Sequence, residues 1–166
     1  MHLTIHRFPD PILKRPARAV RRVDADVKRF IDGMVHLMRH QPRCVGLAAP
    51  QIGRSLRIAV MDASGHPSAK ASRGLLVLVN PSIPAAEGAV VQREGCLSVP
   101  DFTGNVRRAA RVRVAALDRD GEPFECWLEG FEAIVAQHEL DHLDGMLFLD
   151  KVANVATDVF RRKAYF

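Results

Sequence analysis

Apolar residues recur every three or four positions in two segments of the chain, and each segment predicts an amphipathic helix. The first predicted helix begins after Asp24 or Asp26, either of which can cap it, and ends near His40, before Pro42. The second predicted helix begins near Gly130. The apolar positions of the first helix keep the 3.6-residue period and are Val27, Phe30, Ile31, Met34, Leu37 and Met38.

Short apolar or alternating runs bounded by turn residues lie between the two helices and predict β-strands. The predicted strands are residues 57–61, residues 75–80, residues 111–114 and a segment that ends at Leu128. We expect Pro81 to end the second of these strands, and Arg119-Asp120-Gly121 to form the turn before the last one. This order of elements predicts an α+β fold in one compact domain spanning residues 1–166.

The second helix contains the run Gln137-His138-Glu139-Leu140-Asp141-His142, which matches the pattern His-Glu-x-x-His. His138 and His142 are one helical turn apart, so both imidazoles leave the same face of the helix. Glu139 is then placed to act as a general base. The alternative is a solvated helix face with two half-exposed histidines. Against that alternative, both histidines continue an apolar stripe, and a shared metal ion would satisfy two imidazoles that point into a core. The stripe is Phe131, Ile134, Val135, His138 and His142.

The third metal ligand is not supplied by the helix motif. The long zinc-protease signature would place a histidine where Phe148 stands, and no glutamate follows Glu139. The remaining downstream carboxylates, which lie in no supporting motif, are Asp144, Asp150 and Asp158. We therefore expect the third ligand upstream, at Cys96 in the short apolar segment before Pro100.

Three separated motifs carry a resemblance to a known family: Gly46-Leu47-Ala48-Ala49-Pro50-Gln51, Glu94-Gly95-Cys96-Leu97-Ser98 and Gln137-His138-Glu139-Leu140-Asp141-His142. On these motifs the chain resembles the peptide deformylases, which remove the N-formyl group from the initiator methionine of nascent polypeptides and release formate. The resemblance extends from about Phe8 to about Asp150. It implies mixed or antiparallel sheets around a central metal-binding helix.

The resemblance also implies a role for particular residues. Cys96, His138 and His142 would be the metal ligands, and Glu139 the general base. Gln51 and the backbone N–H of Leu97 would stabilise the oxyanion. The residues that would bind the methionyl part of the substrate are Val45, Gly46, Phe131, Ile134 and Val135.

Three further points concern the resemblance. Glu94 and Arg108 match an ion pair that steadies the cysteine segment. Thr103 departs from the family, because many bacterial members carry an arginine near this position that helps to hold the peptide backbone. A basic tail, Arg161-Arg162-Lys163, suits transient contact with the ribosome; the alternative is that the basic residues form a solvated face.

The resemblance implies one divalent metal ion, with Fe²⁺ as the native ion. A ligand set of one thiolate and two imidazoles also suits Zn²⁺, Ni²⁺ or Co²⁺. The substrates would be N-formylmethionyl nascent peptides. Two other functions stay open: a zinc endopeptidase, which needs a histidine or glutamate as third ligand, and a catalytically silent ribosome-associated homologue, which needs a lost ligand or base.

Composition narrows the class of protein. The chain has 166 residues, of which 48% are hydrophobic and 26% charged, and this balance is ordinary for a globular domain. The three cysteines are an odd count, which argues against a disulfide framework and for a reducing cytoplasm. No apolar run is long enough to span a bilayer. The net charge of +5 is not accompanied by a zinc finger, an RNP-like strand or a helix-turn-helix, so we expect no sequence-specific nucleic-acid binding.

Overall fold

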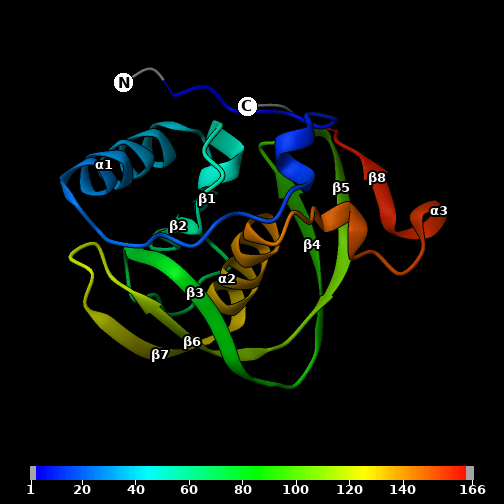
Figure 1. The fold of residues 1–166 in the computed structure, drawn as a ribbon. Helices are drawn as coiled ribbons and strands as arrows, with labels where there is room; N and C mark the ends of the chain where they lie inside the picture. The colour runs from blue at the N-terminus through cyan, green and yellow to red at the C-terminus, as the bar shows by residue number, and fades with distance from the viewer. Residues whose placement is uncertain (1–2, 164–166) are drawn as a thin grey trace.

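The computed structural model describes residues 3–163, in which a run of antiparallel strands lies between two main helices, α1 and α2 (Figure 1). In chain order these elements are η1 (Pro11–Lys14), α1 (Ala25–His40), β1 (Gly46–Ala48), η2 (Ala49–Ile52), β2 (Ile58–Met61), β3 (Leu76–Glu87), β4 (Val90–Cys96), β5 (Val99–Arg108), β6 (Arg111–Leu117), β7 (Pro123–Glu129), α2 (Gly130–Leu143), η3 (Phe148–Asp150), α3 (Val155–Asp158) and β8 (Val159–Arg161).

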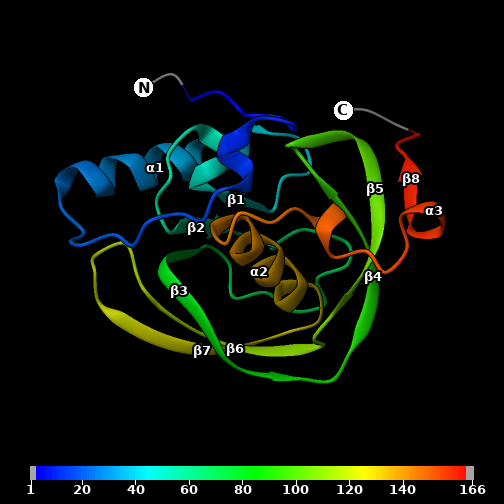
Figure 2. The ribbon, with the colours of Figure 1, turned by 45° about the vertical axis from the view of Figure 1, so that its right-hand side comes forward.

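Two antiparallel sheets lie on different sides of helix α2 (Figures 1 and 2). The larger sheet has the strand order β1-β2-β3-β6-β7, and the smaller sheet has the order β4-β5-β8. The chain crosses between the sheets twice at one corner, from β3 to β4 and from β5 to β6. Gly88 turns the first crossing with a φ of +68°, a conformation that a side chain rarely adopts. The predicted α+β fold with a central helix is confirmed.

Helix α2 is enclosed on several sides rather than along one stripe. Its far face packs into the core of the larger sheet through Ala133, Ala136, Leu140 and Leu143. Phe131 and Val135 of the predicted stripe also pack with this core, whereas His138 and His142 lie beside Cys96 of the smaller sheet, so the helix is buried on both sides. His142, which is 1% exposed, therefore sits among groups that keep water out.

Helix α1 has the bounds that its periodicity predicts. The side chain of Asp24 caps it by accepting a hydrogen bond of 2.9 Å from the N–H of Val27. Its buried residues pack with those of β2 and η2 in a second core cluster, and they are Phe30, Ile31, Met34 and Met38.

The prediction that Pro81 ends the second strand is wrong, because β3 continues to Glu87. The pairing of β3 with β6 shifts register between Val79 and Ser82, so Pro81 lies at an irregularity where the ladder does not need its missing N–H. The other strand predictions agree with β2, β6 and β7. Strands β1, β4, β5 and β8 were not predicted. Within residues 3–163, no helix has the length and apolar character that a bilayer span requires.

Candidate active site and metal centre

The three predicted metal ligands come together where the smaller sheet meets α2. Cys96 is the last residue of β4, and His138 and His142 project from α2. Their ligand atoms all lie within 4.8 Å of one another, and Cys96 Sγ is 3.3 Å from His142 Nε2. A tetrahedral ion with bonds of about 2.0–2.3 Å separates a sulfur and a nitrogen ligand by about 3.5 Å, so the donor set fits such an ion. No other such group occurs in the part of the chain that the structure describes.

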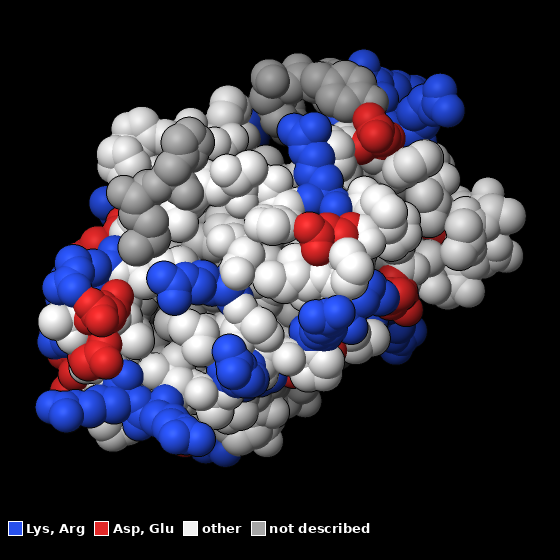
Figure 3. All heavy atoms as spheres, turned by 45° about the horizontal axis from the view of Figure 1, so that its top comes forward, with Lys and Arg blue, Asp and Glu red and all other residues white. Residues whose placement is uncertain are grey.

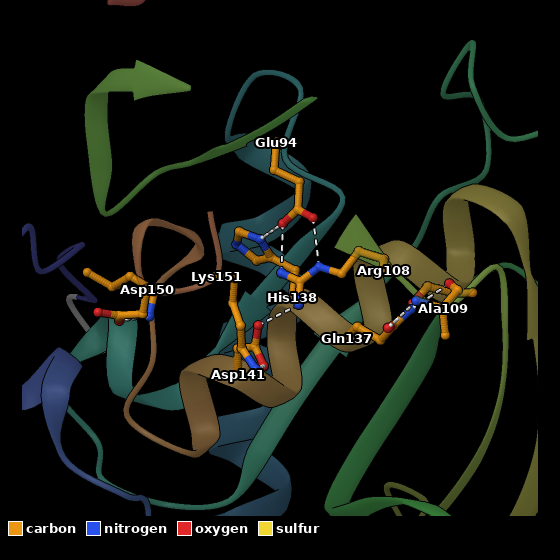
Figure 4. Close-up of polar contacts among 10 residues, drawn as sticks. Glu94, Arg108, Ala109, Gln137, His138, Asp141, Asp150 and Lys151 are labelled. Atoms are coloured by element: carbon orange, nitrogen blue, oxygen red, sulfur yellow. Dashed lines mark hydrogen bonds and ion pairs between the residues drawn. The ribbon is translucent and has the colours of Figure 1, made fainter. Parts of the chain in front are cut away.

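A buried ion pair holds the first histidine in place (Figure 4). Glu94 Oε1 lies 2.8 Å from His138 Nδ1, and its carboxylate also accepts two hydrogen bonds from Arg108, at 2.7 and 2.9 Å. Burial would raise the pKa of Glu94, but hydrogen bonds from Arg108 and His138 lower it to about 2. The ionised carboxylate only accepts, so His138 carries its proton on Nδ1 and leaves Nε2 available for a metal ion. The expected pairing of Glu94 with Arg108 is present.

The cysteine is held in the form that binds metals. Burial raises the pKa of Cys96, but the nearby charge of His142 and the hydrogen bond with His138 hold it well below its usual value. Burial lowers the pKa of His138, while its hydrogen bonds to Cys96 and Glu94 raise it well above the ordinary value. In the absence of an ion, these two shifts favour a thiolate on Cys96 beside a protonated His138. A divalent cation would replace the imidazolium proton as the partner of the thiolate.

Glu139 is a buried carboxylate beside the donor set. It is 4% exposed, and Oε2 has no hydrogen-bond partner among residues 3–163. Burial raises its pKa to about 7, against the opposing charges of His138 and His142. The side chain lies against Gly46, where an added Cβ would be 2.3 Å from Oε1. A carboxyl with a pKa near neutrality can both accept and return a proton, as a general base must.

Gln51 has a fixed amide orientation in η2. Its Oε1 accepts a 2.9 Å hydrogen bond from the N–H of Ala48, so Nε2 faces the metal donors. This nitrogen is 3.4 Å from Cys96 Sγ and 3.2 Å from Ser98 Oγ. Leu97 follows the cysteine in the turn between β4 and β5 and lines the same cavity.

A cavity of about 570 Å³ opens beside the donor set, and Glu139 and Gln51 also face it. The five residues predicted to bind the substrate all line it; they are Val45, Gly46, Phe131, Ile134 and Val135. Sequence reasoning missed other lining residues, among which are Cys44, His66, Gln92, Arg93 and Arg162. His66 comes from the polar loop after β2, and its ring stacks on Phe131 at 4.2 Å between centroids. No motif marks these residues, which come from separate parts of the chain: Cys44 and His66 lie in loops, Gln92 and Arg93 on β4, and Arg162 just after β8.

Comparison with known proteins identifies the family. The family model described as polypeptide deformylase matches residues 2–158. The chain belongs to this family. The peptide deformylase of Alkalilimnicola ehrlichii is 44% identical over 161 residues, which cover 97% of this chain and 88% of the relative. The peptide deformylase of Thermodesulfovibrio yellowstonii is 40% identical over 161 residues, which cover 97% of this chain and 95% of that relative.

Solved deformylase structures share the fold. The crystal structure of a peptide deformylase from Legionella pneumophila has a TM-score of 0.84 at 41% identity and covers 93% of this chain and 88% of that one. A deformylase from Acinetobacter baumannii with Met-Ala-Ser bound has a TM-score of 0.84 at 34% identity, covering 92% and 99% of the two chains. Together, the donor triad and the membership in this deformylase family support a divalent metal ion as cofactor.

Basic side chains are spread over the face of the molecule that Figure 3 shows. They are separated by uncharged and acidic groups and form no continuous stripe in this view. Of the basic tail, Arg161 and Lys163 are exposed, whereas Arg162 is half-buried and lines the cavity. The tail is thus divided between the surface and the site.

Proposed function

We propose that this chain hydrolyses the formyl amide of N-formylmethionyl nascent peptides and releases formate and a free α-amino group. One observation carries the proposal: Glu139, Gln51 and the cluster of three metal donors all face one cavity with an apolar wall. A donor set alone would serve a structural metal site. The combination with a buried base and an oriented amide serves amide hydrolysis.

In this proposal Cys96, His138 and His142 hold one divalent metal ion. When bound, such an ion polarises the substrate carbonyl and lowers the pKa of water. We propose Fe²⁺ as the native ion, and Zn²⁺, Ni²⁺ and Co²⁺ as ions that the same ligands accept. The mixed thiolate and imidazole ligands suit all four.

Glu139 accepts a proton from the attacking water, whose oxygen bonds to the formyl carbon. The formyl oxygen then gains negative charge, and two donors, Gln51 Nε2 and the N–H of Leu97, stabilise it. As the C–N bond breaks, Glu139 returns the proton to the departing nitrogen. Because the carboxylate is buried and Oε2 lacks a partner, its proton affinity is high enough for both transfers.

The methionine side chain occupies the apolar wall of the cavity. This wall is formed by Val45, Phe131, Ile134 and Val135, with Gly46 between the wall and Glu139. Burial of an apolar side chain of this size contributes about 1.5–3 kcal/mol, which favours methionine over small or charged residues.

We further propose that residues 1–166 act as one catalytic domain in the cytoplasm. Exposed Arg161 and Lys163 would support a transient contact with the ribosome. The zinc endopeptidase is disfavoured because the third donor in the cluster is a cysteine. The catalytically silent homologue is disfavoured because no ligand and no base is missing.

Formate release from formyl-Met-Ala-Ser tests the proposal. The protein is prepared without oxygen, loaded with Fe²⁺ and assayed in parallel with acetyl-Met-Ala-Ser and casein. We expect rapid deformylation and much slower deacetylation, because the extra methyl group must fit beside the donor set. Equal rates on both peptides, or cleavage of casein, would contradict the proposed function.

A further inference from the structure

Arg162 lies on the cavity wall although it belongs to the C-terminal tail. Strand β8 pairs with β5, with Phe160 opposite Thr103, and the N–H of Arg162 donates to the carbonyl of Asp101 at 2.8 Å. These contacts extend the backbone alongside β5 and carry the side chain into the site. Arg162 is half-buried there, whereas its neighbour Arg161 is exposed and does not line the cavity.

The guanidinium of Arg162 covers the glycine that precedes the cysteine ligand. A Cβ built on Gly95 would lie 2.5 Å from Arg162 Nη2 and 3.5 Å from Cζ. The same point is 3.6 Å from Thr103 Cγ2. The planar cation thus lies against the backbone of β4, one residue from Cys96. A side chain at residue 95 would displace it.

The two sides of the cavity differ in chemistry. One side is apolar and includes Phe131, Ile134 and Val135 from α2. A second part of the lining is formed by Gly95 of β4, Thr103 of β5 and Arg162, which follows β8. A peptide whose methionine side chain fills the apolar side must run its backbone along the polar side. Its carbonyl groups then need hydrogen-bond donors.

We propose that Arg162 is the residue that holds the backbone carbonyls of the peptide after the formylmethionine, so that it positions peptides rather than single amino acids. This inference rests on the proposed function. A guanidinium presents five N–H donors and no acceptor, so it can bind carbonyl oxygens while keeping a contact within the protein. Thr103 offers one hydroxyl at the same corner and cannot supply a comparable set of donors.

The experiment compares two substrates and four proteins. The substrates are formyl-Met-Ala-Ser and formyl-methionine amide, which has no residue after the methionine. The proteins are the wild type, Arg162→Gln, the charge-keeping Arg162→Lys, and Arg161→Gln as the control from the adjacent position at the end of β8. Metal content and thermal unfolding are measured for each. Binding of the product peptide Met-Ala-Ser is measured by calorimetry as a readout that needs no turnover.

We expect Arg162→Gln to lower the ratio of kcat/KM between the tripeptide and the amide about tenfold, which is the usual scale for one charge-assisted hydrogen bond. The change should lie mainly in KM, and Met-Ala-Ser should bind about tenfold more weakly. For Arg162→Lys, the substrate ratio and the affinity for Met-Ala-Ser should lie between those of the wild type and Arg162→Gln. Arg161→Gln should match the wild type in both. An unchanged substrate ratio and unchanged Met-Ala-Ser affinity in both Arg162 variants would overturn the inference. A wild-type protein that releases no formate from either substrate would instead overturn the proposed function.

Discussion

Replacing Glu139 with glutamine separates its chemical role from its cost to the fold. Glutamine has nearly the same size as glutamate but cannot ionise. Because the carboxylate is buried and Oε2 has no partner among the described residues, its ionised form is poorly stabilised in the folded protein. The same substitution should therefore reduce turnover and raise the stability of the metal-free protein.

The gain in stability can be worked out from the pKa of the carboxyl. Burial raises the pKa of Glu139 from 4.5 to about 7, and each pKa unit corresponds to about 1.4 kcal/mol. A raised pKa means that the unfolded chain ionises more easily than the folded one. Wild-type stability is therefore lost as the pH rises from 4.5 to 7. Relative to wild type, Glu139→Gln should gain about 3 kcal/mol above pH 7 and nothing below pH 4.5.

The same substitution, Glu139→Gln, should lower the rate of turnover although it raises stability. Loss of general acid–base catalysis typically costs about 10²–10⁴-fold in rate, and the loss should fall in kcat because the interaction strengthens only toward the transition state. In the wild type, kcat/KM should rise with pH as Glu139 loses its proton. A bound cation favours the ionised carboxylate. The midpoint of the rise in kcat/KM should therefore lie below the pKa of about 7 that Glu139 has in the metal-free site.

Two assays check this reasoning. Urea unfolding of chelated wild type and Glu139→Gln is measured from pH 4.5 to pH 8, and formate release by the metal-loaded proteins is measured beside metal content. A glutamine variant with bound metal and near-normal kcat would remove the proposed base. A variant that is no more stable than wild type at pH 8 would show that the carboxylate is not desolvated as its burial indicates.

Three further predictions concern the ligands and their support. Cys96→Ala should lose stoichiometric metal while Cys126→Ala keeps it, as measured by metal analysis of each purified protein; full occupancy without Cys96 would exclude it as a ligand. Gly46→Ala should keep the metal but lose at least ~10²-fold in activity, because the new Cβ would lie 2.3 Å from Glu139 Oε1 and must displace the base. Arg108→Met should lower the free energy of unfolding in urea at pH 7 by about 3–5 kcal/mol, because it leaves a buried carboxylate without its cation; a loss below 1 kcal/mol would contradict this account.

Local sequence patterns predicted the two main helices, α1 and α2, well, for a physical reason. The period of α1, the cap at Asp24 and the spacing of His138 and His142 depend on residues within one or two helical turns of each other. Such short-range geometry is set by the helix itself. The ligand triad needed one further step, because nothing local joins Cys96 to the helix and only the family resemblance connected them.

The smaller sheet escaped prediction because its order depends on distant pairing. Strands β4 and β5 include the polar run Gln92-Arg93-Glu94 and the run Thr103-Gly104-Asn105, neither of which alternates cleanly. Their pairing, and the addition of β8 to the edge, bring together residues far apart in the chain. Arg162 was expected to contribute to a basic tail at the surface. It reaches the cavity only because β8 pairs with β5, and no pattern near residue 162 records that pairing.

The two sheets and the helix are tied together at the corner where the chain crosses between sheets. Arg108 is the last residue of β5, and it pairs with Glu94 on β4 and with Asp141 on α2, the latter at 2.6 Å. In the next position, Ala109 exchanges two backbone hydrogen bonds with the side chain of Gln137 (Figure 4). These contacts fix β4, which carries the cysteine, against α2, which carries both histidines. The protein therefore brings its three donors together through its own ion pairs, so a metal ion would enter a site whose ligands are already positioned.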